Sequence, residues 1–265
     1  MDNLLRLLNI MQMLRDPEDG CPWDIQQTFD SIVPYTIEEV YEVADAIDQQ
    51  DFEQLKDELG DLLLQVIYYT QMAREQNLFD FEDVAGTICD KLVRRHPHIF
   101  DKQNIQRDVK KANETWELIK QQERNEKTGF NSNSLLNDIP VAMPQLLRAK
   151  KIQKRVSNVG FDWQETKEVI GKVEEELIEL KEVIDTDNDQ EALEEELGDL
   201  LFSIVNLSRH INVNAEEALR KGNKKFIKRF QYIEQQIKSE GGNIENYNQE
   251  ELERFWKQAK QATRS

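Results

Sequence analysis

The sequence has little of what a β-sheet protein needs at its turns. Only 10 glycines and 6 prolines occur in 265 residues, and both residue types mark the turns that connect strands. Long segments rich in Glu, Lys, Leu and Gln dominate instead, with apolar residues recurring at the 3.6-residue period of a helix. We therefore predict an all-α protein.

Cysteine is almost absent as well. The two cysteines, Cys21 and Cys89, form no CxxC pair, which argues against a zinc site or a disulfide framework and favours a reducing cytoplasm. No apolar run approaches the roughly 20 residues of a membrane span, and Asp2 stands where a secretory signal would be basic. We expect a cytoplasmic protein that does not act at a membrane.

Basic residues are the minority among the charges. The chain has 34 Lys and Arg against 52 Asp and Glu, for a formal net charge of -18. A nucleic-acid-binding surface needs clustered Lys and Arg against the phosphates, so no nucleic-acid partner is expected. The acidic excess fits a protein that attracts divalent cations, although most of it is expected to be solvated helix surface.

The two halves of the chain resemble each other. The segment DELGDLLLQVIYYT starts at Asp57 and EELGDLLFSIVNLS starts at Glu195, which puts Asp61 and Asp199 138 residues apart. Four further segment pairs match in the same order, from CPWDIQQTF and GFDWQET to WELIK and WKQAK. Matches that keep one order along both halves indicate an internal duplication, so we predict tandem duplicated helical bundles.

A polar stretch separates the halves. ERNEKTGFNSNSLLN concentrates serine, asparagine and glycine, and two prolines come after it, as in a linker. We place the first domain at residues 1–123, the linker at 124–137 and the second domain at 138–265.

Each half carries two acidic pairs with a spacing of three residues. The acids are Glu39, Glu42, Glu58 and Asp61 in the first half and Glu176, Glu179, Glu196 and Asp199 in the second. Residues three apart lie close together on one helix face. A turn signal separates the two helices of each half, so we predict an antiparallel hairpin whose apolar stripes face each other and whose carboxylates converge. On the second helix of the hairpin in the second half, the apolar stripe is Leu197, Leu200, Leu201 and Ile204.

Converging carboxylates need protons or a cation. Two charges about 5 Å apart repel by roughly 3 kcal/mol at an effective dielectric constant near 20. All-oxygen ligands select hard cations, Mg²⁺ or Mn²⁺, over zinc, and Mg²⁺ commonly keeps substrate phosphate in its shell. The alternatives are solvated acidic faces and acids that offset a helix dipole. The repetition of both pairs in both halves favours the cation.

Several segments together resemble the MazG family of all-α nucleoside triphosphate pyrophosphohydrolases. They are CPWDIQQTF, YTIEEVYEVADAI, KDELGDLLLQV and KLVRRHPHIF in the first half and GFDW, EEELGDLLFSIVNLSRH and KFIKRF in the second, so the resemblance covers essentially the whole chain. It implies helical bundles, usually dimeric, that bind Mg²⁺ through the ExxE and ExxD acids. The implied reaction is NTP plus water to NMP plus diphosphate.

The resemblance also implies roles for individual residues. The eight acids named above would be the metal ligands, and Glu38 and Glu175, which precede the motifs, would serve outside the ligand shell. The implied catalytic set of the second domain is Glu175, Glu176, Glu179, Glu196 and Asp199.

A nucleotide needs cationic partners beyond the metal. Lys225 and Arg229 share a helix face and resemble the family's phosphate-binding pair, and Asn223 could help to fix the substrate. Trp256 is a candidate for stacking on the base, which would give broad base specificity. The alternatives are surface ion pairs for the basic residues and a structural role for the tryptophan. The first half has Lys91, Arg95 and Trp116 in the matching places.

Two differences between the halves predict that the second domain is the main catalytic one. Asp90 is taken to stand where the second half has Asn223, and Pro97 ends the basic helix of the first half early. His96 and His98 bracket this proline, and a helix-terminating role for HPH is favoured over a metal site.

The expected mechanism is metal-ion catalysis, in which one Glu accepts the proton of the attacking water. A di-iron carboxylate bundle is disfavoured because neither motif has His three residues after its Glu. A non-catalytic nucleotide-binding regulator stays open as the alternative function.

Overall fold

The computed structural model describes residues 2–100, 115–116, 118–120, 122–123, 134–186 and 189–263. These residues form helices and no strand, which confirms the all-α prediction. The chain divides into two compact units, Met1–Gly129 (unit 1) and Phe130–Ser265 (unit 2). The division falls within the expected linker at 124–137, of which residues 124–133 lie outside the described part. None of the described helices combines the length and apolar character needed to cross a membrane.

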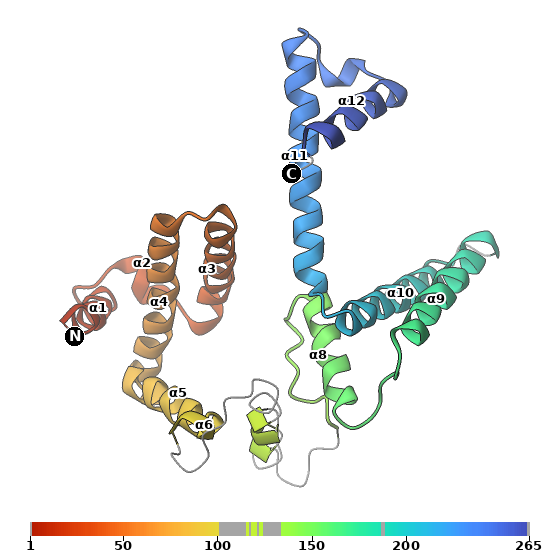
Figure 1. Ribbon diagram of the computed structural model, residues 1–265. Helices are drawn as coiled ribbons and strands as arrows, with labels where there is room; N and C mark the ends of the chain where they lie inside the picture. The colour runs from red at the N-terminus through yellow and green to blue at the C-terminus, as the bar shows by residue number, and fades with distance from the viewer. Residues whose placement is uncertain are drawn as a thin grey trace. The chain divides into compact units, whose positions relative to one another are not determined.

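Unit 1 is built on a hairpin of two long helices. Its helices are α1 (Asp2–Leu14), α2 (Pro22–Gln26), α3 (Phe29–Gln49), α4 (Phe52–Glu75), α5 (Phe81–Arg95) and α6 (Pro97–Phe100). Helices α3 and α4 lie side by side, and α1 packs against α4 (Figure 1). The buried cluster that joins α1, α3 and α4 consists of Met11, Ile32, Ile67, Tyr68 and Met72.

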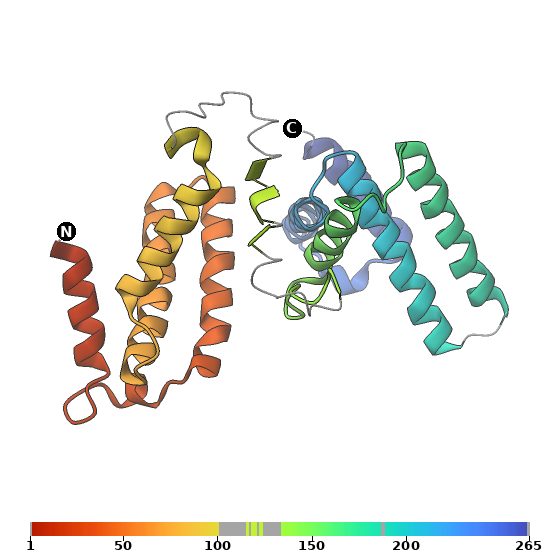
Figure 2. The ribbon, with the colours of Figure 1, turned by 90° about the horizontal axis from the view of Figure 1, so that it is seen from below.

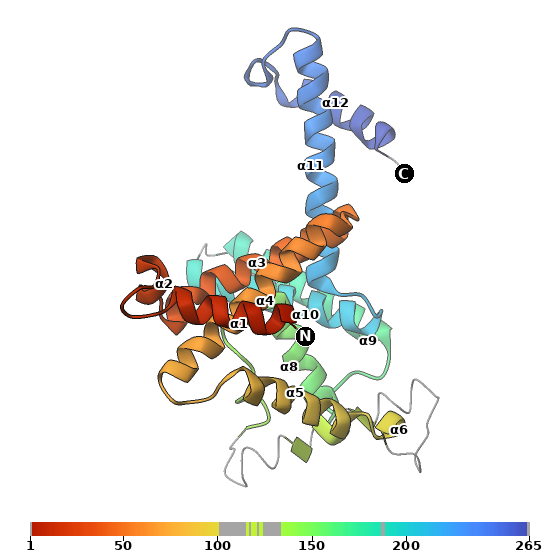
Figure 3. The same ribbon diagram turned by 90° about the vertical axis from the view of Figure 1, so that its left-hand side faces the viewer.

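Unit 2 contains a second hairpin and an extended arm. Its helices are α8 (Gln145–Ser157), α9 (Thr166–Thr186), α10 (Gln190–His210), α11 (Ala215–Ser239), the short 3₁₀ helix η2 (Ile244–Asn246) and α12 (Gln249–Ala262). Helices α9 and α10 lie side by side (Figure 2), with Val169 and Val205 fully buried. Helix α12 folds back on the far part of α11 (Figure 3), around Ile233, Ile237 and Ala259. We call α11 and α12 together the arm.

Local sequence explains where the hairpin helices begin. Thr28 starts α3 with a capping box, in which its side chain accepts from the backbone N–H of Ser31 and Ser31 accepts in return. The side chain of Asp51 accepts from the backbone N–H of Gln54 at the start of α4, and Asp189 caps α10 in a similar way. Each cap satisfies a backbone donor that the first helical turn leaves free. The caps therefore fix where each of these hairpin helices starts.

The same corner comes after the second hairpin helix in both units. Asn77 after α4 and Asn212 after α10 adopt φ of 56° and 57°, in the left-handed region that asparagine tolerates better than most residues. In both corners the next backbone N–H turns back to a helix carbonyl, Leu78 to Ala73 at 3.0 Å and Val213 to Ser208 at 2.7 Å. This shared bend sends α5 and α11 away from their hairpins.

The expected packing of the apolar stripes within each hairpin is wrong in one respect. On α10, Leu200 of the expected stripe is partly buried, but Leu197, Leu201 and Ile204 stay 42–48% exposed, while Ser203, Val205, Asn206 and Ser208 are buried. In unit 1 the matching positions are exposed as well. We call the following sets the apolar faces: Val33, Val40, Tyr41, Leu59, Leu63 and Val66 in unit 1, and Ile170, Leu177, Ile178, Leu197, Leu201 and Ile204 in unit 2. Each hairpin thus turns a different face inward than the stripe predicts.

Candidate active site

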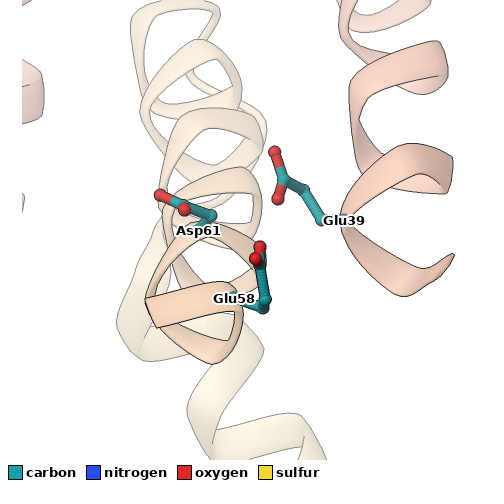
Figure 4. Close-up of side chains that lie close together, drawn as sticks. All are labelled: Glu39, Glu58 and Asp61. Carbon is teal, nitrogen blue, oxygen red and sulfur yellow. The ribbon is translucent and has the colours of Figure 1, made fainter. Parts of the chain in front are cut away.

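The acids of unit 1 converge between the two helices of its hairpin. Glu39 comes from α3, and Glu58 and Asp61 come from successive turns of α4 (Figure 4). One carboxylate oxygen of each lies within 4.8 Å of the others. Glu42, the fourth expected member, lies outside this group but close enough for Glu58 to raise its pKa, after the larger effect of desolvation.

Unit 2 repeats this arrangement. Glu176 of α9 and Glu196 and Asp199 of α10 each place a carboxylate oxygen within 4.8 Å of the others. Glu176 is only 5% exposed. We call each set of three neighbouring acids a close group. Glu179 lies outside the close group of unit 2, and its pKa is raised by desolvation and then by the charge of Glu176. The structure therefore brings together three of the four expected acids in each unit.

Electrostatics in unit 1 disfavour three neighbouring acids that are all ionised and unneutralised. The pKa of Glu39 is raised, first by desolvation and then by the charges of Asp61, Glu42 and Glu58. Gln65 is buried on α4, and its side-chain amide donates to Glu39 Oε1 at 3.4 Å. An all-oxygen donor set with excess negative charge fits a hard divalent ion such as Mg²⁺ or Mn²⁺.

A lysine makes the group in unit 2 different. Lys172 Nζ lies 2.7 Å from Glu176 Oε1 and 2.8 Å from Glu175 Oε1, and these two acids raise the pKa of the lysine. Counting back from the ExxE motif, the matching residue of unit 1 is Tyr35, which meets Trp23 edge-on at 5.9 Å. Among the described residues, Glu176 therefore has a counter-ion and Glu39 has none, and Glu175 contacts the lysine from outside the close group.

Lys172 and Gln65 were not predicted from the sequence. Lys172 precedes Glu176 by four residues, so a search for i,i+4 pairs would have found it. Gln65 comes four residues after Asp61, but Ser203 at the matching position of unit 2 turns its hydroxyl to the carbonyl of Leu200 instead. Because only one unit has the glutamine, the duplication carried no signal for it.

The basic and aromatic candidates of unit 2 lie on the arm. Asn223 and Lys225 are exposed on α11. The Arg229 guanidinium lies 5.7 Å from the centre of the Trp256 ring, and its Nε donates to Thr263 Oγ1 at 3.2 Å. Helix α12 packs on α11, and α9 packs on α10 (Figure 1). In the described part of unit 2, this arm does not pack against the acids of α9 and α10 (Figure 1).

Trp256 has a packing role in this arm. Its ring meets Phe226 at 5.1 Å between centroids and contacts the buried cluster of Ile233, Ile237 and Ala259. This contact agrees with the structural alternative for the tryptophan. Base stacking by Trp256 stays a prediction.

The basic helix of unit 1 repeats the arm in shorter form. Arg95 lies 5.4 Å from the centre of the Trp116 ring, as Arg229 lies over Trp256. Helix α5 ends at Arg95, immediately before His96 and Pro97, whereas α11 continues ten residues past Arg229 to Ser239. The expected early end of this helix is confirmed.

The predicted pairing of Asp90 with Asn223 needs correction. Helices α5 and α11 begin at Phe81 and Ala215, and this register also pairs Arg95 with Arg229. It places Cys89, and not Asp90, opposite Asn223. An acid at the asparagine position is therefore no longer an argument for unequal units.

The chain resembles known proteins along its whole length. The family model described as MazG nucleotide pyrophosphohydrolase domain matches twice, at residues 27–100 and 164–233. The chain is 49% identical over 261 residues to the nucleoside triphosphate pyrophosphohydrolase of Escherichia coli K12, with 98% of each chain covered. It is 46% identical over 255 residues to a Thermotoga maritima protein named nucleoside triphosphate pyrophosphohydrolase/pyrophosphatase MazG, covering 96% of this chain and 94% of that protein.

A third relative is longer. The Bacillus subtilis protein YabN, described as uncharacterized, is 39% identical over 256 residues, which cover 97% of this chain but 51% of YabN. Both matches to the family model contain the acids of the close groups, since Glu39, Glu58 and Asp61 fall in the first match and Glu176, Glu196 and Asp199 in the second.

Proposed function

Because the chain belongs to the MazG nucleotide pyrophosphohydrolase family, we propose that it hydrolyses nucleoside triphosphates to the monophosphate and diphosphate with Mg²⁺, mainly in unit 2. Mn²⁺ is expected to support the reaction in place of Mg²⁺. The observation that carries this proposal is the close group of Glu176, Glu196 and Asp199, repeated in unit 1 as Glu39, Glu58 and Asp61.

The acids supply what a phosphate-bound cation needs. Glu176, Glu196 and Asp199 would hold the ion, with Glu179 one helical turn from Glu176. When bound, Mg²⁺ offsets charge on the phosphate oxygens and orients water for attack. A glutamate of this set that does not bind the ion would accept the proton of that water. Lys172 contacts Glu176 and neutralises part of the charge of this group.

The nucleotide would be held from the arm. Lys225 and Arg229 would contact phosphate oxygens, with Asn223 beside them on α11. Trp256 offers an aromatic ring, and stacking on it would not distinguish one base from another. We therefore expect broad base specificity, with ATP among the substrates, as suits housekeeping of the nucleotide pool in a reducing cytoplasm.

A homodimer would complete the molecule. The apolar face of unit 2 borders Glu196 and Asp199 on α10, and its six side chains are 41–54% exposed in the single chain. Burying apolar area contributes about 25 cal/mol per Å². A second copy would cover this face and would offer a route by which an arm approaches acids that it does not reach within its own unit.

Unit 2 is favoured as the catalytic unit because its basic helix is complete. Helix α11 runs on past Arg229 and carries α12, while α5 stops at Arg95. The test compares Glu196→Gln with Glu58→Gln in the full chain, using NTP with Mg²⁺ and separation of the products. We expect kcat to fall at least about a hundredfold in Glu196→Gln, as loss of a metal-site group commonly costs, and to change little in Glu58→Gln.

The outcomes separate the alternatives. Activity that survives in Glu196→Gln and disappears in Glu58→Gln would assign catalysis to unit 1. Orthophosphate and NDP as the only products would contradict the proposed reaction. Tight Mg²⁺-dependent nucleotide binding without turnover would instead indicate a non-catalytic regulator.

A further inference from the structure

In unit 1 the arginine expected to meet phosphate is already paired with an acid of its own chain. Glu123 Oε2 accepts from Arg95 Nε at 3.0 Å and from Arg95 Nη2 at 2.5 Å. The other oxygen, Oε1, accepts from Arg94 Nε at 2.7 Å. The side chain of Glu123 is only 12% exposed and that of Arg95 19%. One largely buried carboxylate therefore holds two guanidinium groups.

Unit 2 has a hydroxyl in the same place. Arg229 Nε donates to Thr263 Oγ1 at 3.2 Å, and Arg229 lies over Trp256 as Arg95 lies over Trp116. Thr263 comes seven residues after Trp256, and Glu123 comes seven after Trp116. Both the contact and the spacing identify Thr263 as the counterpart of Glu123. The two units thus differ at this position by a full negative charge.

This charge competes with an incoming phosphate. Hydrogen bonds from Arg95 and then Arg94 lower the pKa of Glu123 to about 2, so the carboxylate is ionised at every physiological pH. A carboxylate takes the paired donors of an arginine as a phosphate does. Because Glu123 is tethered to the same unit, it competes at a high effective concentration. Thr263 is neutral and leaves the charge of Arg229 uncompensated by this contact.

We propose that Glu123 determines which unit accepts a nucleotide, by holding Arg94 and Arg95 as an internal substitute for phosphate. The inference rests on the proposed function for the identity of the ligand, a nucleoside triphosphate. A purely structural Glu123, which only fastens the segment of Trp116 to α5, would predict lower stability after its substitution and no gain in anion binding.

The test measures binding of inorganic tripolyphosphate by calorimetry, in EDTA and at moderate salt. The full chain carries Arg229→Ala in every sample of the first comparison, so that the arginine of unit 2 is removed. In this background we expect Glu123→Thr to bind tripolyphosphate about tenfold to a hundredfold more tightly, the range of one or two hydrogen bonds to a charged group. In the chain with Arg229 intact, the reciprocal Thr263→Glu should weaken binding by a similar factor.

Glu123→Gln serves as the second variant because it keeps hydrogen-bonding atoms without the charge. It should show an intermediate gain even if Glu123→Thr fails to fold, as judged by circular dichroism. Equal tripolyphosphate affinity in the parent and in the folded Glu123 variants would overturn the inference. Tripolyphosphate has no base, and the experiment measures its binding and not its hydrolysis. A gain in tripolyphosphate binding without NTP hydrolysis would therefore contradict the proposed function alone, and hydrolysis without the gain would contradict the inference alone.

Discussion

The acids of unit 1 should destabilise the protein when no metal is bound. Glu58 places a carboxylate oxygen within 4.8 Å of both Glu39 and Asp61. At that distance two charges repel by about 3 kcal/mol at an effective dielectric constant of 20. All three side chains keep contact with water, which reduces each repulsion to about 1 kcal/mol. Glu58→Gln removes the repulsions of Glu58 with Glu39 and Asp61, so in EDTA the variant should be more stable by about 1–2 kcal/mol.

Differential scanning calorimetry in EDTA and in MgCl₂ measures this effect. For a unit of this size the gain corresponds to an increase of about 4–7 °C in Tm. In MgCl₂ the order should change, because an ion that binds only the folded parent stabilises it in proportion to the logarithm of ion concentration over Kd. The variant lacks one ligand and gains less from the ion.

Glu53→Gln is the matched control. Glu53 is an acid on the same helix, 86% exposed and paired with Lys56. Its substitution should shift Tm equally in both buffers. A lower Tm for Glu58→Gln in EDTA, or an equal response of Glu58→Gln and the parent to Mg²⁺, would refute the reasoning.

Two further predictions concern unit 2. Asp162 accepts from Arg209 Nη1 at 2.8 Å and from His210 Nε2 at 3.0 Å. Asp162→Asn should therefore lower the free energy of unfolding by about 2 kcal/mol. This is below the range for fully buried ion pairs because the side chains of Asp162 and Arg209 are about one-fifth exposed. Arg209 lowers the pKa of Asp162, so the parent should lose this stabilising contribution as pH falls below about 4 and through the native pKa of Asp162. In urea titrations the stability of Asp162→Asn should depend less on pH in this acid range. The same pH profile of stability in both proteins would contradict this prediction. Leu201→Glu on the apolar face should convert the proposed dimer to monomers in light scattering, whereas Gln190→Glu, which adds the same charge to α10 outside that face, should not; a dimer that survives Leu201→Glu would place the interface elsewhere.

Periodicity and repetition explain what could be predicted from the sequence. The spacing of Glu58 and Asp61 determines that both point from one face of a helix, and a turn signal after α3 brings Glu39 opposite them. Such features depend on residues near one another in the chain. The helical fold, the hairpins and the members of each acidic group were accessible for this reason.

Contacts between distant segments could not be read in the same way. Glu123 was assigned to the end of the first domain with no role, because its pairing with Arg95 arises from tertiary packing across 28 residues. The inward face of α10 was also mispredicted, since the buried Ser203 and Asn206 interrupt the apolar pattern that helix periodicity uses. The acids were thus predictable from the sequence, and Lys172 could have been found by its spacing from Glu176, whereas the pairing of Glu123 with Arg95 could not.

The corner at Asn77 and Asn212 has a consequence for modularity. The two corner residues differ in φ by a single degree, although three residues lead from Asn77 to α5 and two lead from Asn212 to α11. The arms beyond it differ in length and in chemistry. Because the same left-handed corner closes both hairpins, the arm beyond it could change in length and in chemistry while the end of the hairpin kept its backbone conformation.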